Sequence, residues 1–110
     1  MEEIIINIIL NAGSARAQAI SAIQAARGGN LAEAHNLLEQ ARQSLITAHG
    51  VQTDLIQAEA RGEKQEVSLL MVHAQDHLMT AMAVKDLAHE MVEEIKYRLD
   101  LENQLAELKG

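Results

Sequence analysis

Two histidines and an aspartate lie within five residues in the most apolar part of the chain. They are His73, Asp76 and His77, inside the segment SLLMVHAQDHLMTAMAV at residues 68–84, where Asp76 is the only formal charge. Positions i, i+3 and i+4 share one face of an α-helix, so a helix here would present all three side chains together. Such a face can serve as a structural polar layer, a metal site or a nucleophilic site.

The spacing leaves these three interpretations open. A polar layer in an oligomer core can fix helix register and subunit number. The His-x-x-x-His spacing can supply two imidazole ligands to zinc. However, the zinc-protease signature has Glu directly after the first His, where this chain has Ala74, and no third ligand is evident nearby.

The third interpretation is nucleophilic catalysis on a histidine. Neutral imidazole is a good nucleophile near pH 7 and a good leaving group once phosphorylated. A phosphoryl site also needs hydrogen-bond donors, which His77, Gln75 and a side chain from a neighbouring subunit can supply. Gln75 projects away from His73 on the same helix, so any contact of Gln75 with a phosphoryl group would be across subunits.

Composition favours an all-α protein of one domain over residues 1–110. The chain has no Pro, Phe, Trp or Cys, and Tyr97 is its only aromatic residue. A net charge of −7 argues against binding nucleic acid or an anionic membrane surface. The absence of Cys excludes disulfides and thiolate metal sites and agrees with a reducing cytoplasm. The apolar run IIINIIL at residues 4–10 is too short to span a membrane, so it predicts the start of a buried helix.

Two breaks divide the chain into three predicted helices. RGGN at residues 27–30 has paired glycines to end one helix and an asparagine to cap the next, and EARGEKQ at residues 59–65 has a glycine among charges. The predicted helices cover residues 2–27, 31–60 and 64–108. Short connections between long helices imply an antiparallel up-down-up bundle.

Helical periodicity predicts which faces of the second and third helices are buried. The second helix has an apolar stripe that also carries His49: Leu31, Leu38, Leu45 and Ile56. The third helix is apolar on two sides over residues 69–84, so it should be buried on more than one face. Three helices cannot fully enclose one of their own members, so we expect an oligomer with the third helix at the interface. One of its stripes holds Leu69, Leu70, His73, His77, Thr80, Val84, Leu87, Met91 and Ile95, and the opposite side holds Met71, Leu78 and Met82.

The end of the third helix carries a short leucine pattern. Leu101, Leu105 and Leu108 are spaced by four and three residues, as in a coiled-coil seam. The pattern is less than two heptads long, so an exposed amphipathic end explains it almost as well.

The residues of all three predicted helices resemble those of one family. VSLLMVHAQDHLMTAMAVKDLAHEM is similar to the active-site helix of the lactose/cellobiose family of enzyme IIA components of the bacterial phosphotransferase system, which includes the diacetylchitobiose member. NAGSARAQAISAIQAARGGN resembles the first helix and turn of that family, and LAEAHNLLEQARQSLITAHGVQTDLIQAEA resembles its second helix. The resemblance covers almost the whole chain in order.

The resemblance implies a cytoplasmic homotrimer of three-helix bundles that relays phosphoryl groups. Such a protein accepts a phosphoryl group from the histidine phosphocarrier protein and passes it to a cysteine of enzyme IIB. The membrane component then takes up and phosphorylates a β-linked disaccharide of the lactose, cellobiose or chitobiose type. No organic cofactor, nucleic acid or direct membrane insertion is implied. The alternative is a non-enzymatic helical oligomerisation module whose histidines and aspartate form only a buried polar layer.

The same resemblance assigns roles to individual residues. The first histidine of HAQDH, His73, corresponds to the phosphorylated residue, and Asp76 corresponds to an aspartate of which three copies gather near the three-fold axis. The resemblance implies that these carboxylates share one divalent cation per trimer, Mg²⁺, which would offset their mutual repulsion. His77 is a candidate contact of the phosphoryl group, and Gln75 is a candidate contact from the neighbouring subunit. We expect a structural role for His49, and the alternative is that it approaches the histidine pair from the second helix.

Overall fold

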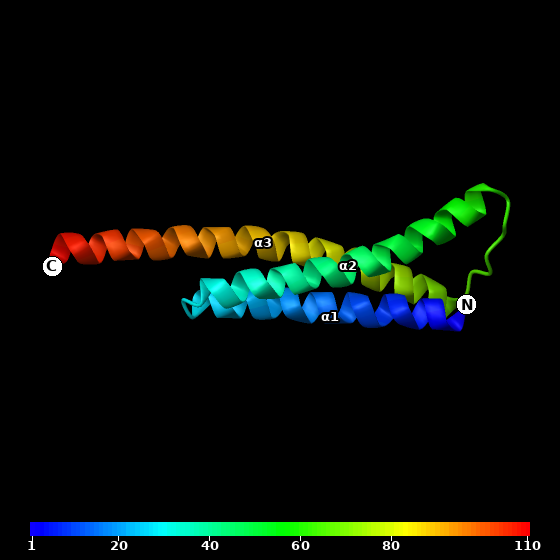
Figure 1. Cartoon of the computed structure of the whole chain (residues 1–110), viewed down its shortest axis with the longest axis horizontal. Coiled ribbons are helices and arrows are strands. Elements are labelled where there is room, and N and C mark those ends of the chain that lie inside the picture. Colours follow the sequence, from blue (N-terminus) through cyan, green and yellow to red (C-terminus); the bar gives the residue numbers. More distant parts are fainter.

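The chain folds into three long α-helices. The computed structural model describes all 110 residues, with α1 at Glu2–Arg27, α2 at Leu31–Ala60 and α3 at Leu69–Lys109. Figure 1 shows α2 running back along α1 and α3 running back along both, which is the up-down-up order. The bundle is elongated, with extents of 68 × 20 × 19 Å. The prediction of an all-α chain with three helices is therefore confirmed.

Capping residues decide where the second and third helices begin. The Asn30 side chain accepts a hydrogen bond from the backbone N–H of Glu33, and α2 starts at Leu31 as predicted. The third helix was expected from residue 64, which is wrong by five residues. The hydroxyl oxygen of Ser68 accepts a hydrogen bond from the N–H of Met71 at 3.1 Å, so this serine caps α3 and the helix starts at Leu69.

Alanine dominates the core of the bundle. After Ile5 and Ile8, every buried residue of α1 is an alanine, from Ala12 to Ala26. Because a methyl group is the whole side chain, these positions let α2 and α3 approach the α1 backbone closely. The predicted buried start of the first helix is confirmed only on one side, since Ile6 and Leu10 of the same run are 50% and 65% exposed.

The apolar stripe of α2 holds for its first half only. Leu38 and Leu45 are buried and Leu31 is half-buried, as predicted. Ile56 is 60% exposed, so its predicted burial is wrong within the chain. Figure 1 shows the reason, because the C-terminal end of α2 bends away from α1 and loses its support.

The two apolar sides of α3 differ in how far they are buried within the single chain. Met71 and Leu78 point into the core, together with Ile95 and small residues between them. The opposite side remains open to solvent, with Leu69 87% and Leu87 65% exposed. One chain therefore buries the side that carries Met71 and Leu78 and leaves much of the other stripe exposed. Ile95 was predicted on that other stripe, which is wrong, since it is buried in the core.

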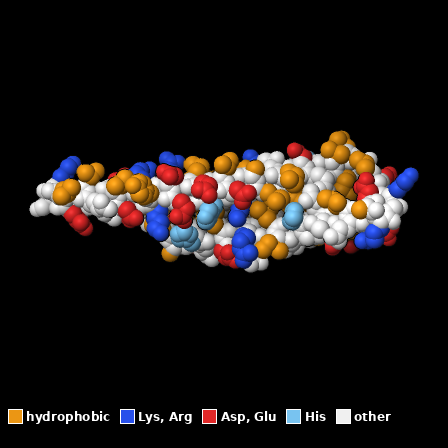
Figure 2. Space-filling view, turned by 90° about the horizontal axis from the view of Figure 1, so that it is seen from above, with side chains coloured by type: hydrophobic (Ala, Val, Ile, Leu, Met, Phe, Trp, Pro, Cys, Tyr) orange, Lys and Arg blue, Asp and Glu red, His pale blue; other side chains and the backbone are white.

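The last part of α3 extends beyond the other helices. Figure 1 shows α3 continuing well past the turn between α1 and α2, and every residue of 100–110 is exposed. In Figure 2 this tail is the narrow end of the molecule, where hydrophobic and charged side chains alternate. Its leucines, Leu101, Leu105 and Leu108, are 44%, 56% and 84% exposed. No helix of the bundle combines the length and hydropathy needed to cross a bilayer.

Candidate functional site

His73 and His77 form a stacked pair on the first turns of α3. Their ring centroids are 5.6 Å apart and the ring planes differ by 19°. His73 is exposed and His77 is half-buried, and neither imidazole has a hydrogen bond or an ion pair within the chain. The nitrogen atoms of His73 are thus accessible to a reacting group, while His77 holds one side of its ring.

A glycine of α1 lies against His77. A methyl group on Gly13 would be 3.6 Å from Nε2 of His77, and no other side chain or neighbouring backbone atom would come within 4 Å of it. Glycine in the middle of a helix costs about 1 kcal/mol relative to alanine. The glycine therefore leaves the space between this position of α1 and Nε2 of His77 free of a side chain from residue 13.

Apolar side chains surround the histidine pair on the surface. Leu69 and Leu70 lie one turn before His73 on α3, and Leu10 lies one turn before Gly13 on α1. Leu70 is 45% and Leu10 is 65% exposed. An exposed apolar rim of this kind suits a protein surface that is covered during function.

Asp76 lies on the outer face of α3 with free carboxylate oxygens. It is exposed and has no hydrogen bond or ion pair within the chain. No three side chains among His, Cys, Asp and Glu come together as a metal site within one chain. Carboxylate oxygen is the ligand that Mg²⁺ prefers, so Asp76 fits such a cation only if several chains each supply one carboxylate.

Gln75 lies on the other side of α3 and is paired with Gln52 of α2. Gln52 Nε2 donates a hydrogen bond to Gln75 Oε1, and it also lies 3.9 Å from the sulfur of Met79. The Nε2 of Gln75 lies 3.5 Å from the sulfur of Met71. The two glutamines line a hollow of about 310 Å³ beneath the bent end of α2. As the sequence predicts, Gln75 does not contact His73 of its own chain.

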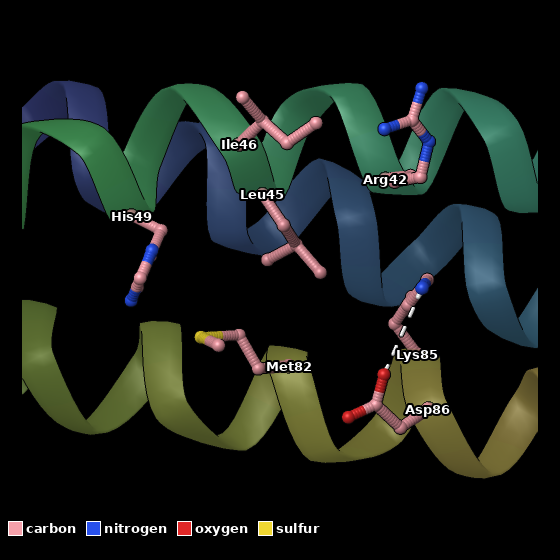
Figure 3. A pocket seen from close by; sticks show the side chains of 7 residues that line it. All are labelled: Arg42, Leu45, Ile46, His49, Met82, Lys85 and Asp86. Atoms are coloured by element: carbon pink, nitrogen blue, oxygen red, sulfur yellow. Dashed lines mark ion pairs between the residues drawn. The ribbon is translucent and has the colours of Figure 1, made fainter.

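His49 belongs to a separate groove between α2 and α3. Figure 3 shows its imidazole pointing from α2 toward Met82 of α3, beside Leu45. His49 is exposed, and none of His73, Asp76 and His77 lines this groove of about 160 Å³. Within this groove His49 is accompanied by Met82, Lys85 and Asp86 rather than by the motif residues.

Ion pairs neutralise the charges along this groove. Arg42 binds both carboxylate oxygens of Glu39, with the shorter contact at 2.6 Å, and Lys85 lies 3.8 Å from Asp86. The hydrogen bonds from Arg42 are the main cause that lowers the pKa of Glu39 from 4.5 to about 2. The same contact raises the pKa of Arg42. Paired charges of this kind contribute little stability at an exposed surface.

Sequence reasoning missed two residues that shape the site, Gln52 and Gly13. Gln52 occupies an inner position of α2, one turn after buried Ala48, where a polar residue is unusual. Gly13 interrupts an otherwise helix-favouring stretch of α1 without ending the helix. A polar residue on an apolar stripe and a glycine in mid-helix are both signals that a sequence can show, but neither names its partner.

Comparison with known proteins places this site in a family. Residues 3–96 match the family model "PTS system, Lactose/Cellobiose specific IIA subunit". The lichenan-specific phosphotransferase enzyme IIA component of Bacillus subtilis (strain 168) is 56% identical over 93 residues, which cover 84% of each chain. The crystal structure of the cellobiose-specific enzyme IIA from Bacillus anthracis superposes with a TM-score of 0.86 at 47% identity, covering 90% of this chain and 91% of that one.

A third relative is known in a complex. The solution structures of the IIA(Chitobiose)–HPr complex of the Escherichia coli phosphotransferase system include a chain with a TM-score of 0.75 and 42% identity to this one, covering 87% of this chain and 93% of that one. The resemblance read from the HAQDH segment is therefore confirmed, and with it the prediction of a phosphoryl-transfer component rather than a passive oligomerisation module. This chain belongs to the lactose/cellobiose-specific enzyme IIA family of the phosphotransferase system.

Proposed function

We propose that His73 carries the phosphoryl group in a relay between the histidine phosphocarrier protein and enzyme IIB. The observation that carries this assignment is the exposed imidazole of His73 on the family's motif helix, stacked on half-buried His77. A nucleophile has to be reached by two successive partners, which favours the exposed ring over the half-buried one. His77 is the candidate that holds the ring of His73 or contacts the phosphoryl group.

The chemistry of the relay requires only ring nitrogens and donors. A lone pair of the neutral His73 imidazole attacks the phosphorus of the incoming phosphohistidine, a new N–P bond forms, and the old N–P bond breaks as the partner's imidazole leaves. The other ring nitrogen of His73 keeps its proton. In the second transfer a cysteine thiolate of enzyme IIB attacks the phosphorus, and the His73 imidazole leaves.

The apolar rim around His73 supports docking of a partner that excludes water. Phosphohistidine hydrolyses when water reaches it, so a closed contact protects the group during transfer. The E. coli relative is known in a complex with HPr, which supports the histidine phosphocarrier protein as the donor here. Both partners act in the cytoplasm, where we therefore place this chain.

The sugar proposed for this system is a β-linked disaccharide. The relatives are named for lichenan, cellobiose and chitobiose, which share β-linked sugars. In the proposed relay this chain carries the phosphoryl group and the membrane component binds the sugar, so the choice among lactose, cellobiose and chitobiose types belongs to the membrane component.

A homotrimer explains the exposed face of α3. At about 100° per residue, Asp76, Leu87, Leu101 and Leu105 fall within roughly 40° of one another on the helix. In a parallel trimer this face would meet at the three-fold axis, bury the leucines and bring three copies of Asp76 together. A divalent cation, which we take to be Mg²⁺, would neutralise the three carboxylates.

Trimer formation would also complete the site around His73. On α3, His73 and Gln75 flank the Asp76 face from opposite sides. Adjacent helices in a parallel trimer place opposite flanks against each other, so each His73 would face the Gln75 flank of the neighbouring subunit.

The test is intact mass after incubation with phosphoenolpyruvate, enzyme I and the histidine phosphocarrier protein. We expect one added phosphoryl group on the wild type and none on His73→Gln, with the same base-stable, acid-labile linkage that phosphohistidine shows. His35→Gln is the matched control, because His35 lies on α2 away from the motif and should leave phosphorylation intact. An unmodified wild type with active reagents would refute the relay, and a phosphorylated His73→Gln would move the acceptor to His77.

A further inference from the structure

Gln52 stands apart from the other polar residues of the chain. It is the only polar residue that is buried, at 8% exposure, and its side chain makes the hydrogen bond that joins the bent half of α2 to α3. A buried amide without a partner is costly, and the hydrogen bond that Gln75 accepts offsets this cost. The pair lies at the level of the histidine motif along α3, since Gln75 is two residues from His73.

The hydrogen bond occupies the carbonyl end of the Gln75 amide and leaves its nitrogen end without a strong partner. Its carbonyl oxygen accepts from Gln52, and the sulfur of Met71 lies 3.5 Å from its nitrogen. A thioether is a weak acceptor, and the amide nitrogen has two N–H groups, so Gln75 keeps a donor for a stronger acceptor. If the amide were turned over, its carbonyl oxygen would face outward and would repel an anionic oxygen.

We propose that Gln52 is a positioning residue for phosphoryl transfer, which acts by holding the Gln75 amide with its N–H groups available to the phosphoryl oxygens on His73 of the neighbouring subunit. This inference rests on the proposed function and on the trimer. In this role the Gln52 amide orients the Gln75 amide. Such orientation helps transfer because donors that are fixed before the reaction stabilise developing charge without reorganisation. Gln52 itself touches no reacting atom.

A structural tie between α2 and α3 is the competing explanation for the same hydrogen bond. In that case the loss of either glutamine would lower the free energy of unfolding, and phosphoryl transfer by a fully folded chain would keep its wild-type rate. The two explanations therefore differ in whether the loss of Gln52 slows transfer while the chain is fully folded.

A double-mutant cycle, measured well below the unfolding temperature of every variant, separates them. Gln52→Met, Gln75→Met and the double variant keep side chains of similar length and remove the amides one at a time. The readouts are the rate of phosphoryl transfer from the phosphorylated phosphocarrier protein and the half-life of the phosphohistidine. We expect each single variant to slow transfer about tenfold, in line with the loss of one hydrogen bond at a reacting group. The double variant should be no slower than Gln75→Met, whereas multiplied losses would overturn the proposal.

Gln52→Glu gives a second, directional test. A carboxylate accepts hydrogen bonds only, so it would draw the N–H groups of Gln75 toward itself and turn the carbonyl oxygen outward. We expect a larger loss of transfer than for Gln52→Met, although both variants remove the same hydrogen bond. Transfer at the wild-type rate in Gln52→Glu would overturn the proposed orientation.

NMR of the unphosphorylated protein keeps this inference separate from the proposed function. The side-chain amide of Gln75 should be ordered in the wild type and mobile in Gln52→Met, with the order parameter of the Gln75 NH₂ group as the readout. A wild-type protein that accepts no phosphoryl group in the mass assay would refute the relay, and the order of the Gln75 amide could still be measured. A Gln75 amide that is equally mobile in both proteins would defeat the positioning role by itself.

Discussion

Replacing Leu78 with alanine should destabilise the bundle by about 3 to 5 kcal/mol. Leu78 is fully buried on α3, directly after His77, in a core cluster that includes Ile8, Ala12 and Ala74. Leucine-to-alanine changes at buried sites cost more when the site cannot collapse around the cavity. Here six of the eleven residues in the cluster are alanines, whose methyl groups cannot fill the cavity, so we expect a loss typical of a site that collapses only in part.

Urea unfolding followed by far-UV circular dichroism measures this change. Wild type and variant are compared at one protein concentration, because dissociation of an oligomer would add a concentration term to the apparent stability. At roughly 4 °C per kcal/mol for a chain of this length, the melting temperature should fall by about 12 to 20 °C. His73 lies on the outer side of α3, so phosphorylation in the cold should survive the change.

Leu69→Ala is the matched control, because it removes the same atoms from a side chain that is 87% exposed. It should cost less than about 1 kcal/mol. A loss for Leu78→Ala that is no larger than the loss for Leu69→Ala would refute the assignment of this α3 face to the core.

Four further changes have defined outcomes. Gly13→Val puts methyl groups against Nε2 of His77, so it should shift the imidazole NMR signals of His77 and lower the free energy of unfolding. Unchanged imidazole signals would contradict that contact, and so would a loss of stability that a second change, His77→Ala, does not relieve. Ser68→Ala removes the cap of α3 and should lower the free energy of unfolding by about 1 kcal/mol in urea, where an unchanged midpoint would show that the cap is dispensable. If the chain forms the proposed trimer, Leu105→Glu should lower the fraction of trimer in analytical ultracentrifugation while the helix content stays the same. A trimer that forms equally well in the variant would show that the tail is not part of the interface. Because the adjacent Arg42 guanidinium lowers the pKa of Glu39 from 4.5 to about 2, the ionised carboxylate stabilises the native state above about pH 4.5, and this contribution is lost as the pH falls toward 2. Glu39→Gln should therefore make the free energy of unfolding depend less on pH in that window at low salt. Identical pH dependence in the two proteins would argue against the ion pair of Glu39 with Arg42.

The division of the bundle into faces was only partly predictable. Helical periodicity correctly placed Leu38 and Leu45 inside, because α2 is supported by α1 along that half. The same periodicity placed Ile56 inside, and that failed because the end of α2 bends away from its neighbour. Periodicity describes the direction of a side chain on its own helix, and burial also requires a second helix at that place.

The chemistry of the site divides in the same way. The HAQDH motif identified His73, Asp76, His77 and Gln75 as candidates because residue type and spacing are local properties. The contact between Gly13 and His77 and the hydrogen bond between Gln52 and Gln75 join residues far apart in the sequence. Such contacts depend on the register of one helix against another, which no local pattern specifies.

The sequence by itself determined the helices, most of their ends and the family of the protein. Helix propensity, caps and motifs act over a few residues, so they can be read without knowledge of the packing. Only the tertiary structure decided which apolar face of α3 is inside the chain, since both faces are hydrophobic and hydropathy cannot rank them. The alanines of α1 admit α3 closely along the side that carries Leu78, and this close approach leaves His73 and Asp76 on the outer surface.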